Sequence, residues 1–268
     1  MNSYMEVIES LQWGFQALGY ACTFRLNELD HSCTNIVFGF VAAINTGNTF
    51  PPGTILYNME QYAGFEPASR ETFAAIADRY QIFDYSQVNV AWWLQFNPRY
   101  RPYYARVSYA PCLTRIEPRV SEDIDLLFVG ALYPTRAENL FNCGKVISEN
   151  AYSVMSLTNV WGQQRDEFIS RAKVMLNLSN PSIDTKIFEI VRVSYYLANR
   201  KAVVCEAKAD QVIESDMKAV LKFGDSRQIP DLCAELLQDR ELRSRYSQEC
   251  FEVFAQRDVR DVIHGFFS

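Results

Sequence analysis

The sequence predicts an α/β protein with two lobes, each built on a parallel sheet. Short apolar runs without strict alternation recur in both halves of the chain, as is typical of strands buried on both faces. Stretches with helical spacing separate these runs, so the strands are joined by crossovers and lie parallel. A segment with two prolines and mixed charge, residues 111–123, separates the halves. We therefore expect a first lobe of residues 1–117 and a second of residues 118–268.

Composition limits the classes of protein and site that the chain fits. Its 268 residues, 49% of them hydrophobic, are enough for a sizeable core. The net charge of −6 and the lack of a basic run argue against a nucleic-acid partner. Seven cysteines without a CxxC pair favour the reducing cytoplasm, and two histidines argue against a histidine-rich metal site. Because no apolar run approaches ~20 residues, we expect no membrane span and no signal peptide, while peripheral membrane contact stays open.

The first half is predicted to begin with a helix over residues 4–18. Val7, Leu11, Phe15 and Leu18 repeat there at helical spacing, and Gly19 is a natural end. Further strands are expected at residues 21–26, 35–40, 54–58, 81–86 and 107–110, and helices at 68–79 and 87–96. Since the chain starts at a helix, we expect the first lobe to lack its first strand.

The second half is organised around residues 173–206, which follow the order strand, loop, helix, strand. The strands are 174–178 and 202–205, and the helix between them, which Asp184 can cap, ends near Asn199. Before this unit we expect strands at 125–130 and 154–157, with helices from about 136 and at 164–171. After it we expect a strand at 221–225 and helices at 229–238, 241–254 and 259–267, the last of which is predicted to pack back on the first lobe.

The same unit carries a pattern of residue types that points to a family. Its succession of Leu-Asn, Phe-Glu, Leu-Ala-Asn, Val-Val and Glu resembles the C-terminal half of GT-B-fold glycosyltransferases, especially small polysaccharide-assembly and spore-maturation-type members. The resemblance covers residues 123–255 well. It implies two Rossmann-like lobes, with the nucleotide-sugar donor in the second and the acceptor beside the first. The larger retaining branch has two glutamates eight apart. This chain has Glu189 but Leu197 and Ala198 near the second position, so the retaining mechanism does not simply transfer.

The resemblance implies a cytoplasmic enzyme that transfers a sugar from a nucleotide-sugar to a glycan or lipid-linked acceptor. The donor is then a substrate, and neither a separate cofactor nor a metal is expected. The apparent lack of a first strand keeps open a GT-B-like binding or scaffold subunit without catalysis. A dinucleotide-dependent enzyme is disfavoured, because the chain has no GxGxxG motif.

Candidate donor-binding residues follow the strands of the second lobe, because ligands of parallel sheets bind beyond the carboxyl ends of the strands. They are Gly130, Arg136, Asn177, Lys186 and Glu189. Arg136 and Lys186, each expected at a helix start, would meet a diphosphate. By the resemblance, Glu189 would accept hydrogen bonds from ribose or sugar hydroxyls. Each residue also has a structural alternative, which for Glu189 is an ion pair one helical turn away and for Asn177 a loop cap.

Candidate catalytic residues of the first lobe are Glu60 and Asp84, which follow two different strands. In an inverting transferase, one carboxylate takes the proton from the attacking acceptor hydroxyl. The alternative for each is a turn or cap acid. Tyrosines and tryptophans within residues 92–109 could stack on an acceptor sugar, although aromatic residues are more often part of a core.

Overall fold

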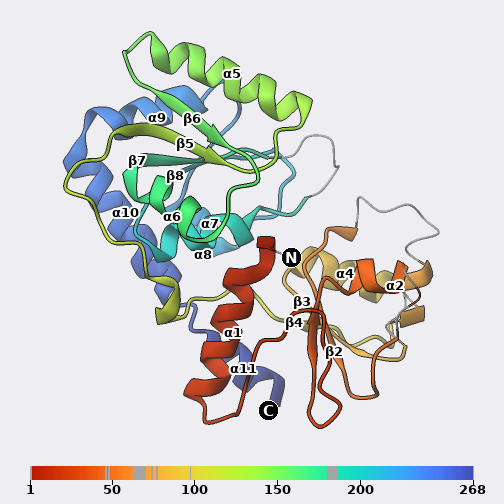
Figure 1. Ribbon diagram of the computed structural model, residues 1–268. Coiled ribbons are helices and arrows are strands. Elements are labelled where there is room, and N and C mark those ends of the chain that lie inside the picture. Colours follow the sequence, from red (N-terminus) through yellow and green to blue (C-terminus); the bar gives the residue numbers. More distant parts are fainter. Residues whose placement is uncertain are drawn as a thin grey trace. The chain divides into compact units, whose positions relative to one another are not determined.

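The computed structural model describes residues 2–45, 47, 49–62, 71–73, 75, 76, 78–96, 98–179 and 186–267. It divides into two compact units (Figure 1), a first of Met1–Val107 with Val259–Ser268 and a second of Ser108–Asp258. The predicted ranges of 1–117 and 118–268 place this boundary about ten residues later. The last helix, which was expected to pack back on the first lobe, belongs to the first unit. Each unit contains one parallel sheet, which confirms the expected fold class.

The first unit has a four-stranded parallel sheet of order β1-β2-β3-β4. Its strands are β1 (Ile36–Phe38), β2 (Ile55–Asn58), β3 (Gln81–Asp84) and β4 (Tyr103–Tyr104). Its helices are α1 (Met5–Ala17), α2 (Phe40–Asn45), α4 (Gln87–Phe96) and α11 (Val259–Phe267). As expected, no strand precedes α1 among the described residues, where a 3-10 turn (Asn2–Tyr4) stands instead.

Side chains that alternate along β3 divide the core of the first unit between the two faces of the sheet. Ile82 packs with Leu56, Phe40 of α2 and Trp93 of α4. Phe83, pointing the other way, contacts Phe266 of α11 at a ring distance of 4.5 Å. Helices α1 and α11 lie side by side (Figure 1).

Close contact between α1 and α11 requires Gly14. A Cβ atom at this position would come within 2.7 Å of the Ile263 Cδ1 and 2.8 Å of a Val259 methyl. Only glycine leaves room for these two side chains. Because Gly14 has no side chain, α11 can pack closely against α1.

The second unit has a five-stranded parallel sheet of order β6-β5-β7-β8-β9. Its strands are β5 (Ile124–Val129), β6 (Val154–Leu157), β7 (Ala172–Asn177), β8 (Ala202–Glu206) and β9 (Lys222–Gly224). Its α-helices are α5 (Pro134–Ser148), α6 (Gly162–Arg171), α7 (Ile190–Ala198), α8 (Ser215–Val220), α9 (Ile229–Gln238) and α10 (Arg240–Ala255). Helices α5 and α9 cover one face, and α6 and α7 cover the other (Figure 1).

Strand order locates the ligand-binding edge of the second unit. The chain goes from β5 to its neighbour β6 on one side, and then crosses to β7 on the other side of β5. The connections after β5 and β7 therefore leave the sheet on opposite faces. Such a switch point opens a crevice at the carboxyl ends of the two strands, where ligands of open α/β sheets bind.

Three predicted elements differ from the structure, and the predicted helix at 68–79 lies partly outside the described residues. Residues 21–26 form no strand and do not belong to the sheet, and most of them are exposed. Residues 107–110 contain only a single bridge, Tyr109 to Asp258. The central helix begins at Ile190 instead of near Asp184, which lies outside the described residues. Among the described helices, none combines the length and apolar character needed to cross a membrane.

Candidate functional site

Two arginines and a glutamate meet at the switch point of the second unit, and we call Arg136, Glu189 and Arg192 the arginine cluster. Arg136 Nη2 lies 3.4 Å from Glu189 Oε1, and Arg192 Nη2 lies 3.3 Å from Glu189 Oε2. Both guanidinium carbons lie 5.7 Å from the centre of the Phe128 ring, which comes from β5. The cluster thus brings residues that follow β5 and β7 together over one aromatic ring.

Arg136 is the most enclosed member of the cluster. Its side chain is 3% exposed, and it sits in the first turn of α5 as expected. Nη1 donates to the Ala131 carbonyl at 2.8 Å, and Nε donates to the Ser179 carbonyl at 3.3 Å. Burial and the neighbouring Arg192 lower the pKa of Arg136, while Glu189 opposes the shift. The arginine therefore fixes the loops after β5 and β7 as well as carrying charge.

Arg192 reaches the end of β7 from the first turn of α7. Its Nη1 donates to Asn177 Oδ1 at 2.9 Å. The buried Nδ2 of Asn177 has no hydrogen-bond partner among the described residues, and its register partner on β8 is Cys205. The pairing of Arg192 with Glu189 is the structural alternative considered for that glutamate. Sequence reasoning did not propose Arg192 as a ligand-facing residue.

Gly130 directly follows β5, but its backbone N–H is not available to a phosphate, contrary to the expectation. The N–H donates to the Leu157 carbonyl at 2.9 Å, so it is occupied and does not point to a ligand. The position instead provides room. A Cβ atom there would lie 3.1 Å from the Phe128 ring and 3.3 Å from Arg192 Nη2. A larger residue would press on the arginine cluster.

Lys186 does not lie on a helix, contrary to the expectation. It precedes the bridge between Ile187 and Val212, and its carbonyl accepts from the Val212 N–H at 2.6 Å. The extended backbone has its own pairing partner, so α7 starts only after Glu189. Lys186 is exposed, and it forms no ion pair within the part of the chain that the structure describes.

Glu206, which sequence reasoning missed, ends β8 beside the cluster. Its carboxylate accepts from the Ser179 N–H and hydroxyl, both at 3.0 Å, and from Asn139 Nδ2 at 2.9 Å. The signal was present, because Glu206 is the polar residue that ends a buried strand, as Asn177 is. Ser179 and Asn139 show that this carboxylate holds the loop after β7.

The first unit brings Glu60 and Asp84 to the carboxyl edge of its own sheet. Asn58 Nδ2 donates to the Glu60 carbonyl at 2.9 Å and to Asp84 Oδ2 at 2.8 Å. Asn89 Nδ2 likewise donates to the Glu60 carbonyl at 2.8 Å and to Asp84 Oδ1 at 3.0 Å. The half-buried side chain of Glu60 accepts from the Tyr4 hydroxyl at 2.5 Å, and burial together with this bond raises the pKa of Tyr4. The two acids are therefore neighbours in one network.

Asp84 is enclosed. Its exposure is 0%, and its oxygens accept from the Ser86 N–H, Asn58, Asn89 and Trp93. Burial raises the pKa of the carboxyl to about 7, and the four donors oppose this shift. Glu60 is the more accessible of the two acids. The catalytic roles of both remain predictions.

The pKa of Asp84 predicts a pH dependence of stability. The folded state binds the proton more tightly than the unfolded chain, whose carboxyl titrates near 3.8. This contribution to the free energy of unfolding is full below about pH 4 and is lost as the pH rises to 7 and above. Three pKa units correspond to at most about 4 kcal/mol. Urea unfolding of the wild type and of Asp84→Asn at several pH values measures this contribution. The free energy of unfolding of the wild type, relative to that of Asp84→Asn, should fall as the pH rises from 4 to 7. Parallel pH profiles would contradict it.

Comparisons with known proteins identify the fold. The chain superposes on Anabaena Alr3699/HepE in complex with UDP and glucose with a TM-score of 0.63 at 9% identity, covering 87% of this chain and 76% of that one. The fold is that of the GT-B glycosyltransferases. TarM matches with a TM-score of 0.62 at 10% identity over 87% of this chain and 54% of its own, so the chain spans about half the length of TarM. No family model matches the sequence, and no curated protein does.

A third GT-B structure agrees over almost the whole chain. AviGT4, a glycosyltransferase involved in avilamycin A biosynthesis, has a TM-score of 0.55 at 13% identity, covering 97% of this chain and 86% of its own. At these identities the likeness concerns the fold. It agrees with the resemblance found in the sequence, and with the two parallel sheets of the structure.

Proposed function

We propose that the protein transfers a sugar from a nucleotide-sugar to a glycan or lipid-linked acceptor. The observation that carries this proposal is the arginine cluster at the switch point of a GT-B second unit. Solved GT-B structures with this fold include complexes with UDP and with UDP-glucose. The site and the ligand of these similar folds therefore support the same class of donor.

Charge explains how the cluster would hold a diphosphate. The two guanidinium groups and one carboxylate of the cluster carry a net charge of +1, and the carboxylate of the adjacent Glu206 is already occupied by Ser179 and Asn139. Guanidinium groups bind phosphate oxygens through paired hydrogen bonds. The side chain of Arg192 is 20% exposed and that of Glu189 is 23% exposed, so both are accessible from solvent. In the proposal, Arg192 meets the diphosphate and Glu189 accepts from donor hydroxyls.

The remaining candidates complete the proposal. The Asn177 side chain lies against Arg192, and the exposed Lys186 adds positive charge three residues before Glu189. The arginines and the lysine take the role of offsetting phosphate charge, so the proposal names no metal. Glu60, half-buried at the carboxyl edge of the first unit, is the proposed base for the acceptor hydroxyl.

The donor assignment predicts a large effect of Arg192→Met. Losing a charge-assisted hydrogen bond to the ligand should weaken UDP-glucose binding by about tenfold to over a hundredfold. Arg200→Met is the matched control, because it removes the same charge at the far end of α7, where Arg200 stacks on Phe251. We expect this control to change affinity less than about threefold. Calorimetric titration measures both, and an unchanged affinity in Arg192→Met would place the donor elsewhere.

Measuring turnover distinguishes a glycosyltransferase from the alternative, a binding or scaffold subunit without catalysis. With UDP-glucose and GDP-glucose as probes, release of UDP or GDP measures the reaction or its hydrolytic side reaction. Glu189→Gln keeps both arginines but removes the carboxylate, so we expect weaker nucleotide-sugar binding and lower turnover. Binding by the wild type without any release of nucleotide would favour the non-catalytic alternative.

A further inference from the structure

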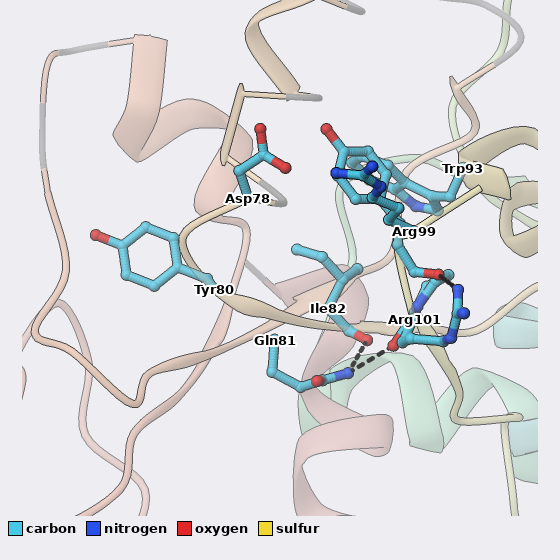
Figure 2. Close-up of a pocket in the computed structure, with 9 residues that line it drawn as sticks. Asp78, Tyr80, Gln81, Ile82, Trp93, Arg99 and Arg101 are labelled. Carbon is cyan, nitrogen blue, oxygen red and sulfur yellow. Dashed lines mark hydrogen bonds between the residues drawn. The ribbon is translucent and has the colours of Figure 1, made fainter. Parts of the chain in front are cut away.

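A pocket of about 430 Å³ opens in the first unit, away from its carboxyl edge (Figure 2). It is lined by residues that come just before or at the start of β3 and β4, together with Trp93 of α4. Because the strands are parallel, these residues lie at the amino edge of the sheet. Glu60 and Asp84 lie at the opposite edge, so this pocket is separate from the proposed catalytic residues.

The lining combines hydrogen-bond donors with acceptors. Arg101 Nη1 donates to the Pro98 and Tyr100 carbonyls at 2.7 and 2.8 Å. Its Nε and Nη2 make no hydrogen bond within the described part of the chain, and the side chain is exposed. Gln81 Nε2 donates to the Ile82 and Arg101 carbonyls at 3.2 and 2.9 Å, as the dashed lines in Figure 2 show. The Gln81 amide oxygen and the exposed Asp78 carboxylate are acceptors at the same pocket.

Aromatic side chains make the pocket rigid. Trp93 and Tyr100 are buried and lie edge to face at 6.1 Å. The Tyr80 hydroxyl donates to the Phe50 carbonyl at 2.9 Å and accepts from the Phe50 N–H at 3.1 Å, which holds the half-buried Tyr80 ring in place. A preformed wall of this kind lowers the entropic cost of binding. Trp93 and Tyr100 belong to residues 92–109, for which the sequence suggested contact with a sugar, whereas Tyr80 lies outside that range.

We propose that this pocket binds an anionic sugar, a sugar ring that carries a carboxylate or a phosphate. Arg99 and Arg101 supply positive charge at the pocket, and guanidinium groups match both kinds of anion. Gln81 accepts from ring hydroxyls and Tyr80 offers an apolar face, whereas the Asp78 carboxylate repels the anion and weakens its binding. Since the protein as a whole carries a net charge of −6, an anion would be retained here by these local groups and not by a global positive field. The proposal does not depend on the donor site of the second unit.

Calorimetric titration with four probes tests the ligand class. Hyaluronan tetrasaccharide presents carboxylates, glucose 6-phosphate presents a phosphate, maltotetraose is neutral, and inorganic phosphate lacks a sugar. We expect at least one of the first two to bind at least tenfold more tightly than both maltotetraose and inorganic phosphate, and the better of the two identifies the anion. Equal binding of maltotetraose would overturn the requirement for charge, and equal binding of inorganic phosphate would overturn the requirement for a sugar.

Variants place the ligand in the pocket. Arg101→Gln should weaken binding of the better probe at least tenfold, whereas Arg79→Gln, which removes an exposed arginine that does not line the pocket, should change it less than threefold. Asp78→Asn removes a like charge and should strengthen binding at least twofold, an effect that a folding defect would not imitate. Arg192→Met should leave the affinity unchanged. Equal losses in Arg101→Gln and Arg79→Gln, or a loss confined to Arg192→Met, would overturn the assignment.

Discussion

Trp93→Ala should destabilise the first unit by about 4–5 kcal/mol, at the upper end of the range for truncating a buried tryptophan. The side chain is 1% exposed, and its ring meets Tyr62 at 4.8 Å and Tyr100 at 6.1 Å. Truncation removes these contacts and leaves a cavity. It also removes the Nε1 donor that lies 3.2 Å from Asp84 Oδ2, so the buried carboxylate loses one of its partners. Urea unfolding followed by circular dichroism measures the loss.

Trp92→Ala is the matched control for this prediction. Trp92 is the preceding residue on α4, but it is half-buried and stacks on Tyr62 at 4.8 Å from one side. Less apolar area returns to water and a smaller cavity forms, so we expect about half the loss. Similar losses in the two variants would mean that the core of the first unit is not centred on Trp93.

Arg257→Met should destabilise the second unit by about 3 kcal/mol. The arginine is 2% exposed and pairs with two acids, lying 2.5 Å from Asp216 and in contact with Glu214. Burial raises the pKa of Glu214, and Arg257 opposes this shift. Breaking a buried ion pair leaves uncompensated charge, which costs 3–5 kcal/mol in typical cases. The acids are about a third exposed, so we expect the lower end of that range.

Arg245→Met tests whether the effect comes from burial. Arg245 lies on α10 and pairs with Glu249 at 4.0 Å, but its side chain is 67% exposed. Exposed pairs of this kind contribute at most about 0.5 kcal/mol. Chemical denaturation of both variants gives the comparison. A loss of less than 1 kcal/mol for Arg257→Met would show that solvent replaces the ion pair.

Most elements followed from local patterns in the sequence. The predicted helix at 87–96 and the predicted strand at 154–157 match α4 and β6 residue for residue. In the second unit β5, β7 and β8 contain the uninterrupted apolar runs 126–129, 174–176 and 202–205, so these strands are visible without knowledge of their partners. The short helices α2 and α8 were missed, because six residues give too few repeats of a helical pattern.

The sequence predicted where the residues of the candidate site lie in the sheet, but not the contacts between them. The rule that ligands bind beyond parallel strands led to Asn177 and Glu189, and both lie at the switch point. The partner of Glu189 from α5 is 53 residues away in the chain, a distance that no local pattern reports. Lys186 was misplaced because its backbone pairs with Val212, and this pairing keeps the residue out of the helix.

The seating of α11 against α1 has a consequence for the order of folding during synthesis. The first unit includes residues that follow the whole of the second unit in the chain. Val259 and Ile263, which fill the space above Gly14, therefore leave the ribosome only after β5 to α10 have been made. Domains that emerge complete fold as units. We thus expect the second unit to reach its native state first. Until α11 has been made, the apolar face of α1 that it covers stays exposed to solvent, where a chaperone can bind it.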